Sequence, residues 1–445
     1  MSRWAKQIQM QHKIPAIGIA SSNIVHYALD YDFKYNNGMP IRYVAVPFPF
    51  TGQPKDVDVG YVTGKDVLSG QPLMDSIIGA LTRPLTAEEQ ISGPPGALSE
   101  PRLLASDTEE NLRVLFEDKG WTDYNWIQLP TEKRVNEMLK GTSRKPDDVI
   151  KTIDITGGSR QLTVEKVAIG AVMAGASPEH FPVILALATQ APFGNSTSSM
   201  ANMVVINGPI RKRLNFNCGT NSLGPYNRTN AVVGRAFTII SKFAGDLRNN
   251  VNAWESLGSN IQYNNLCFAE NEEGLPEGWD PLHVQMGFKP ADDIVTVGVG
   301  WTSISSVGGS QRLYPTHHLM RDYMRSLSAS GSAATILMDP TVAALLKDTH
   351  GFKTKAELSE WFSQNVETTA GTYWGNGVIQ STNVPLALQG LEPYASWRKL
   401  PDDALIKPFI NKNAVRVVVT GGKIQTVWFV TDFRLTRGVK VADWA

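Results

Sequence analysis

The chain has 445 residues, of which 42% are hydrophobic and 19% are charged. These proportions are ordinary for a globular protein and exclude wholesale disorder. Lys and Arg together number 42, as do Asp and Glu, so the formal net charge is zero. Charge therefore gives no reason to expect a nucleic acid or an anionic membrane as a partner.

Cysteine content and hydropathy indicate where the protein works. Two cysteines, Cys218 and Cys267, are too few for a disulfide scaffold and fit a reducing compartment. The first 22 residues lack the apolar run of a signal peptide. The longest apolar stretches, Val167–Ala176 and Val183–Ala188, are too short to span a bilayer. We therefore predict a cytoplasmic protein, and we see no internal repeat in its sequence.

The sequence pattern in the first part of the chain predicts a small, incomplete β-α-β-α domain. Ile14–Ala20 and Ile41–Pro47 are short apolar runs typical of strands, and helices are expected over Asn23–Tyr35 and Asp66–Leu81. This order is half of a doubly wound α/β unit. Parallel sheets are usually larger and covered on both faces, so we expect either later residues or a partner subunit to extend this one.

The sequence of the rest of the chain predicts a larger mixed α/β domain. A stretch rich in Pro and Gly separates the two parts and is typical of a linker. The predicted divisions are a partial domain at 1–85, a linker at 86–105, a main domain at 106–310 and a C-terminal α/β portion at 311–445, packed on the main domain. Within the last portion, Val415–Thr420 and Lys423–Val430 flank Gly421-Gly422 and predict a hairpin, which could cover the edge of the first strand.

A group of acidic residues and a histidine forms the first candidate site. In a strand over Phe268–Glu272, Glu270 and Glu272 would project to the same side. Two neighbouring carboxylates are tolerated in water, around a cation, or where one holds a proton. The loop that follows can return His283 to them, which predicts a catalytic group for proton transfer or a site for Mn, Fe or Zn. An exposed acidic turn is the alternative.

A glycine-rich loop forms the second candidate site. Residues 217–228 precede a predicted helix over about Thr229–Phe243, and such loops let backbone N–H groups approach an anion. The loop lacks the Gly-Lys-Ser/Thr of a nucleotide-binding P-loop. We expect it to hold a substrate carboxylate or carbonyl in the same cleft, unless it is only a tight structural loop. The predicted substrate-binding residues are Asn207, Asn217, Asn227 and Arg228.

Four segments of the chain together resemble one known family. They are EKRVNEMLKGTSRKPDDVI (Glu132–Ile150), TVEKVAIGAVMAGASPEHFPVILA (Thr163–Ala186), VVINGPIRKRLNFNCGTNSLGPYNRTNAVVGRA (Val204–Ala236) and NLCFAENEEGLPEGWDPLHVQMGF (Asn265–Phe288). In combination they resemble the long C-terminal part of the UGSC-type (seleno)protein family, named for a Sec/Cys-Gly-Ser-Cys motif, over at least residues 104–300. The resemblance implies a redox or related enzyme and no certain reaction.

The chain departs from that family because the naming motif is absent. Neither Cys218 nor Cys267 lies in a Cys-x-x-Cys context, so the chain is a degenerate member or the motif lies on a companion subunit. We expect the large subunit of a hetero-oligomeric enzyme that acts on a small organic acid or carbonyl compound by thiol- or metal-assisted reduction. The alternatives are a metal- or acid–base-dependent hydratase or lyase, and a non-catalytic scaffold.

Overall fold

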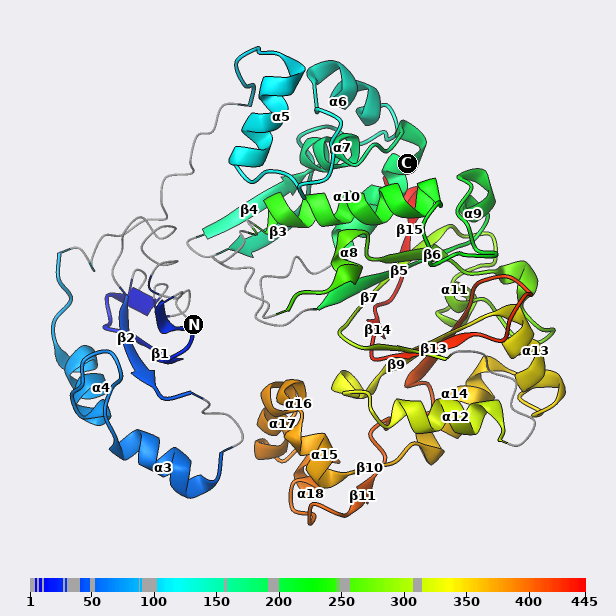
Figure 1. The fold of residues 1–445 in the computed structure, drawn as a ribbon. Coiled ribbons are helices and arrows are strands. Elements are labelled where there is room, and N and C mark those ends of the chain that lie inside the picture. The colour runs from blue at the N-terminus through cyan, green and yellow to red at the C-terminus, as the bar shows by residue number, and fades with distance from the viewer. Residues whose placement is uncertain are drawn as a thin grey trace. The chain divides into compact units, whose positions relative to one another are not determined.

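The structure, a computed structural model, contains helices together with parallel and antiparallel strand pairs, as expected for an α/β protein (Figure 1). It describes residues 12–26, 41–48, 53–87, 102–155, 158–190, 200–245, 257–306 and 314–445, with isolated positions at 5, 8, 9, 29, 89 and 247. The chain divides into two compact units, the first at 1–108, 152–161 and 244–254 and the second over the remaining residues. No helix of the described ranges is long and apolar enough to cross a bilayer.

The first unit contains the two predicted strands as a parallel pair. The elements are β1 (Ile17–Ser21), β2 (Arg42–Val46), α3 (Lys55–Thr63) and α4 (Leu73–Thr82). β1 and β2 pair in register from Ile17 opposite Arg42 to Ser21 opposite Val46. Within the described residues this sheet has two strands. Helix α3 was not expected, and most of the helix predicted over 23–35 lies outside the described residues.

The predicted helix Asp66–Leu81 is wrong at its beginning. The carboxylate of Asp66 accepts hydrogen bonds from the backbone N–H groups of Ala45, Leu68 and Ser69, which fixes residues 66–71 as a turn. The helix α4 then begins after Pro72, whose extended backbone serves as its N-cap. Side-chain capture of nearby N–H groups is how Asp competes with a helix.

The second unit contains two larger sheets. One has the order β14-β7-β5-β6, with β15 also pairing with β7, and the other has the order β12-β9-β13-β8. The strands of the first sheet are β5 (Ala201–Asn207), β6 (Leu266–Ala269), β7 (Ile294–Gly300), β14 (Arg434–Leu435) and β15 (Val439–Lys440). Those of the second are β8 (Ser303–Ser305), β9 (Ala334–Met338), β12 (Val415–Val419) and β13 (Trp428–Thr431).

These two sheets repeat one topology and exchange an edge strand. In each, the first strand (β5 or β9) has a parallel neighbour on one side (β6 or β12) and an antiparallel neighbour on the other (β7 or β13). The strand after β7, β8, pairs with β13, whereas the strand after β13, β14, pairs with β7. The second unit therefore contains a structural repeat that its sequence does not reveal.

A buried aspartate, Asp432, lies where the chain passes from each sheet to the edge strand of the other, between β7 and β8 and between β13 and β14. The carboxylate of Asp432 accepts hydrogen bonds from the N–H groups of Trp301 and Thr302, each at 2.8 Å, and from the hydroxyl of Ser328 at 2.9 Å. The side chain is almost fully buried. The backbone approaches closely here, because a Cβ added at Gly300 would meet the side chains of Phe433 and Asp432. Asp432 thus ties together the crossing segments of the two sheets.

The two sheets pack against each other and carry helices on their outer faces. Met203 and Phe268 of the first sheet share one apolar cluster with Leu337 and Val418 of the second. The helices near the first sheet include α7 (Val164–Met173), α8 (Phe181–Gln190) and α10 (Arg228–Ala244), and those packed on the second include α12 (Thr316–Met324), α13 (Pro340–Asp348) and α14 (Lys355–Asn365). Figure 1 shows this order of helices, two sheets and helices.

The structure also contains further helices, 3-10 turns and strands. Among helices and 3-10 turns they are α5 (Glu109–Asp118), α6 (Glu132–Leu139), η1 (Pro178–His180), α9 (Ile210–Arg213), η2 (Asn260–Tyr263), η3 (Glu272–Gly274), α11 (Leu282–Gln285), η4 (Ser330–Ser332), α15 (Ala370–Gly375), α16 (Gly377–Thr382), α17 (Val384–Leu388), α18 (Tyr394–Trp397) and η5 (Val441–Trp444). The remaining strands are β3 (Val149–Ile155) with β4 (Gly158–Thr163), and β10 (Thr368–Thr369) with β11 (Leu405–Ile406).

The hairpin predicted over Val415–Val430 is wrong. β12 and β13 do not pair with each other, because β9 lies between them. The chain between them is held elsewhere: the N–H of Gly421 donates to the carbonyl of Cys218, and the N–H of Val427 donates to the carboxylate of Asp339. Both strands therefore belong to the four-stranded sheet of the second unit, and the hairpin that was expected as a cover for β1 does not form.

Candidate functional site

The candidate site begins where two parallel strands end. Asn207 is the last residue of β5, and Glu270 follows the last residue of the neighbouring strand β6. The side-chain amide of Asn207 donates to Glu270 Oε2 at 2.7 Å. Polar groups at the carboxyl ends of parallel strands are a common location for binding sites. The strand predicted over Phe268–Glu272 is wrong at its end, because β6 ends at Ala269.

Glu270 is buried and its acceptor positions are already in use. Besides Asn207, its carboxylate accepts from the N–H of Leu282 at 2.7 Å and the N–H of Val419 at 3.4 Å. Lys355 completes the set with its ammonium nitrogen 2.6 Å from Glu270 Oε1, and both side chains are essentially inaccessible to solvent. A carboxylate has about four lone-pair sites. Glu270 therefore connects β5, α11, β12 and α14, and these four donors leave it no lone pair for a substrate.

Glu272 and His283 face each other beside this group. Glu272 begins the turn η3 and accepts from the N–H of Gly208 at 2.7 Å and from the amide of Asn207 at 3.1 Å. His283 lies on the short helix α11, with Nδ1 at 3.8 Å from Glu272 Oε1 and Nε2 at 3.4 Å from the carbonyl of Pro290. The structure thus brings Glu270, Glu272 and His283 together, while their catalytic role remains a prediction.

Two buried polar atoms in this group have no hydrogen-bond partner among the described residues. They are Oδ1 of Asn207 and Nδ1 of His283. Both residues are fully buried. Because buried polar atoms in native proteins are nearly always paired, such orphans commonly mark a position that a ligand, a proton or a water completes. They identify the Asn207–Glu272–His283 side as the incomplete part of the group.

The predicted metal-binding role does not fit this arrangement. The lone pairs of Glu270 are directed at N–H donors, and the Lys355 ammonium occupies the position of a cation. Glu272 in turn accepts from Gly208 and Asn207 and contacts the guanidinium of Arg211. A cation would have to compete with two fixed positive charges. Consistently, no group of three or more His, Cys, Asp or Glu in the described part of the chain is arranged to hold a metal ion.

Arg211 is the central cation of the site, and the sequence patterns did not predict it. Its guanidinium lies 2.9 Å from Glu272 Oε2 and contacts both carboxylate oxygens of Glu273 at 3.1 Å. It also donates to the backbone carbonyls of Gly208 and Glu270. Burial opposes its charge, but the two carboxylates raise its pKa overall. Its position in the short helix α9, three residues after Gly208 and close to the end of β5, was the signal available in the sequence.

The two cysteines differ in their surroundings. Cys218 is half-buried, and its sulfur lies 3.9 Å from the guanidinium of Arg211. Burial raises the pKa of Cys218, and Arg211 only partly offsets this. Cys267 is buried, and its burial raises its pKa to about 12. Because the thiolate is the reactive form, Cys267 is the inert thiol and Cys218 the more accessible one.

The glycine-rich loop uses its own amides to fold. The Asn217 side chain donates to the carbonyl of Thr220 at 2.9 Å and to Asn227 Oδ1 at 2.7 Å, and Asn227 donates to the carbonyl of Asn221 at 2.6 Å. These bonds support the alternative of a tight structural loop. Arg228 is exposed and lies near Glu179 and His180, whereas it is Arg211 that contacts Glu272.

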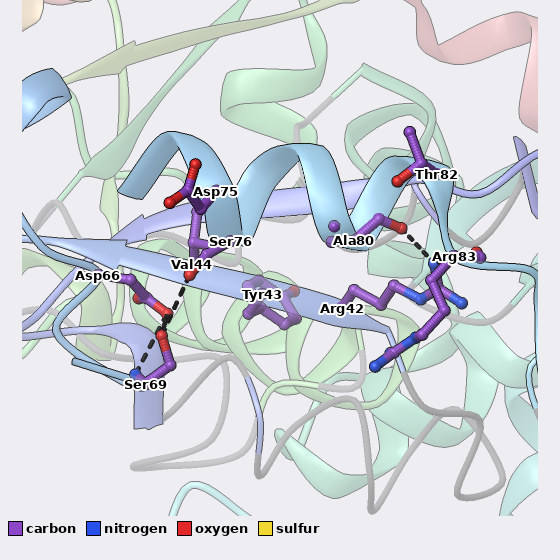
Figure 2. Close-up of a pocket in the computed structure, with 11 residues that line it drawn as sticks. Arg42, Tyr43, Val44, Asp66, Ser69, Asp75, Ser76, Ala80, Thr82 and Arg83 are labelled. Carbon is purple, nitrogen blue, oxygen red and sulfur yellow. Dashed lines mark hydrogen bonds between the residues drawn. The ribbon is translucent and has the colours of Figure 1, made fainter. Parts of the chain in front are cut away.

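The first unit contains a cavity of about 620 Å³ between β2 and α4. Figure 2 shows Asp66 and Ser69 at one end of it and Arg42 and Arg83 at the other. The charged groups that are buried there are already paired: Arg42 lies 2.6 Å from Glu89, and Asp66 accepts three backbone N–H groups. None of the predicted site residues lines this cavity.

Comparison of the chain with protein-family models, with curated proteins and with solved structures found no match. The assignment of a function therefore rests on the geometry of the site.

Proposed function

We propose that this chain is the large subunit of an enzyme that acts on a small organic acid or carbonyl compound. The observation that carries the proposal is the pair Glu272 and His283, with an orphaned imidazole nitrogen facing a carboxylate next to a buried arginine. A carboxylate and an imidazole at this separation can pass a proton to or from a substrate, which is the role of a general acid–base pair. The arginine supplies the charge that would orient a carboxylate or a carbonyl oxygen.

Acid–base chemistry, as in a hydratase or lyase, is the reaction class that these residues support best. Glu272 and His283 can supply it with the groups present. Reductive thiol chemistry is the second candidate, because the accessible Cys218 lies beside Arg211 and a companion chain could bring further thiols. The metal-assisted form is not proposed, since the residues do not fit a cation.

A companion subunit is part of the proposal. Met74, Ile78 and Leu81 are each two-fifths or more exposed and follow one another at helical spacing on α4. An apolar stripe of this kind is typical of an interface. The parallel pair β1–β2 also has fewer strands than independently stable parallel sheets. A β-α element of the companion, carrying the Cys-Gly-Ser-Cys-like motif, would extend the sheet and cover the stripe.

Solvent isotope exchange tests the proposed chemistry even when the full reaction is unidentified. The native assembly, purified with any companion, is incubated in D₂O with a panel of small oxo and hydroxy acids, and deuterium at carbon is followed by NMR. Glu272→Gln should lower the exchange rate by about 10²–10⁴-fold, the usual contribution of a general acid or base. Glu277→Gln is the matched control, because Glu277 lies five residues away and is fully exposed.

Unchanged exchange in Glu272→Gln, with Glu277→Gln as reference, would contradict the acid–base proposal. No exchange with any acid by the wild-type assembly would favour the scaffold alternative or the thiol reaction. Those two outcomes are separated by adding a dithiol reductant, which only the thiol reaction would consume.

A further inference from the structure

Glu273 occupies the solvent side of the arginine at the centre of the site. Among the described partners of Arg211, Gly208 and Glu270 contribute backbone carbonyls, and the Glu272 side chain is only 14% exposed. The Glu273 side chain is 49% exposed, whereas that of Arg211 is 4% exposed. A molecule that approaches Arg211 from solvent therefore meets Glu273 first.

The contact between these residues has the form that a bound substrate would take. Both oxygens of Glu273 face the guanidinium, at 3.1 Å each. Bidentate pairing is the usual way in which arginine recognises a carboxylate. Of the two carboxylates on Arg211, Glu273 is the more exposed, with 49% of its side chain accessible against 14% for Glu272, so a solute can reach Glu273 more easily.

Glu273 also has a second cation within reach. The ammonium of Lys212 lies 2.7 Å from Glu273 Oε1, and the Lys212 side chain is 71% exposed. If Glu273 leaves Arg211, it keeps this partner at the surface. Its hydrogen bonds with Arg211 lower its pKa to about 2, so the carboxylate stays ionised at neutral pH and protonation does not release it. A competing anion is the remaining means of release.

From this geometry we infer that Glu273 is a built-in carboxylate latch on Arg211, and that the substrate is a small carboxylate that binds by displacing it. The inference rests on the proposed function, since it names the substrate class of that site. The displaced Glu273 turns toward Lys212, and the substrate carboxylate then lies beside Glu272 and the sulfur of Cys218. While the site is empty, the latch gives the buried guanidinium a second carboxylate partner beside Glu272.

Alkylation of Cys218 can report whether a carboxylate has displaced Glu273 from Arg211. Cys218 lies 3.9 Å from Arg211, and the only other cysteine of the sequence, Cys267, is buried. A carboxylate bound at Arg211 should shield Cys218 from alkylation by iodoacetamide, which intact mass reads as one added group. The test uses the native assembly, pyruvate as the carboxylate probe, and methyl pyruvate as its uncharged counterpart.

Glu273→Gln removes the competing charge. The apparent affinity of a site that is blocked most of the time falls by the fraction that is open. We therefore expect the pyruvate concentration that half-protects Cys218 to drop at least about tenfold in Glu273→Gln, and to drop less in Glu273→Asp, which keeps the charge on a shorter side chain. Glu277→Gln should behave as the wild type, and methyl pyruvate should not protect.

Any other outcome contradicts the proposal that the substrate displaces Glu273 from Arg211. Equal protection in the wild type and in Glu273→Gln would leave a carboxylate site at Arg211 without a latch. Protection lost in Glu273→Gln would make Glu273 part of the binding site. No protection by pyruvate in any variant would remove Arg211 as a carboxylate site, while the isotope exchange at Glu272 would still report separately on the proposed acid–base chemistry.

Discussion

At the scale of single residues, three neighbouring glutamates have three different surroundings. Glu270 is saturated by donors, Glu272 faces an orphaned imidazole nitrogen, and Glu273 is half-exposed on an arginine. The sequence shows the three side by side but cannot separate them, because the groups that do so come from distant segments. Lys355, for example, lies 85 positions after Glu270 and carries no motif.

Removal of Lys355 should be strongly destabilising. Lys355→Met leaves the Glu270 carboxylate buried without its cation, and breaking such a pair costs about 3–5 kcal/mol. Urea unfolding measures the loss, and Lys353→Met, at an exposed position two residues away, is the control. A loss as small as in the control would show that Glu270 reaches solvent or another cation.

Stability should fall in mild acid because of His317. Burial, with smaller contributions from His318, His350 and Arg321, lowers its pKa from the ordinary 6.5 to about 4. Between these values the unfolded chain binds the proton and the folded one does not, so the contribution is complete above pH about 6.5 and is lost as pH falls toward about 4. Unfolding at pH 7 and pH 5 measures it.

The control for this pH dependence is a pair of variants. His317→Phe keeps a ring among Phe352 and Trp361 and should reduce the difference between the two pH values. His26→Phe, at an exposed position, should leave it unchanged. The same pH difference in His317→Phe as in the wild type would assign the effect to other groups.

At the scale of elements, the sequence predicted those strands whose position is determined by their own residues. The strands β1 and β2 follow from the apolar runs over Ile14–Ala20 and Ile41–Pro47. The hairpin over Val415–Val430 failed because glycines can turn a chain but do not determine which strand lies next to it. The strand that lies next to β12 is β9, which pairs with it in parallel, for example with Met338 opposite Val419. The site was predicted in part for the same reason: Asn207 ends β5 and Glu270 directly follows β6, whereas Arg211 is recognised only through its tertiary partners.

The crossing of the two sheets should depend on Asp432. Asp432→Asn loses the charge that accepts two backbone N–H groups and the hydroxyl of Ser328, and we expect a loss of about 2–4 kcal/mol. Thermal and urea unfolding measure it against Asp403→Asn, at an exposed position. Equal stability of both variants would mean that the crossing holds without this side chain.

At the scale of the whole molecule, α4 carries an exposed apolar stripe, Met74, Ile78 and Leu81, which the proposed companion subunit would cover. Replacement of Met74, Ile78 and Leu81 by Gln should abolish co-purification of the companion and improve solubility of the chain expressed alone. Native mass spectrometry reports the first and centrifugation the second. Val114→Gln, at a similarly exposed position on α5, is the control. A stripe variant that still carries its companion would place the interface elsewhere.

The exchange of β8 and β14 also has a consequence for the order in which the protein matures on the ribosome. Strand β7 is made early, yet its edge partners β14 and β15 come from residues 434–440. Until these emerge, the half that carries Asn207 and Glu270 presents an open, apolar edge that can pair with another nascent chain. We infer that the half that carries the candidate site cannot be produced as an isolated fragment, and that translation must continue to residues 434–440 before this half can fold completely.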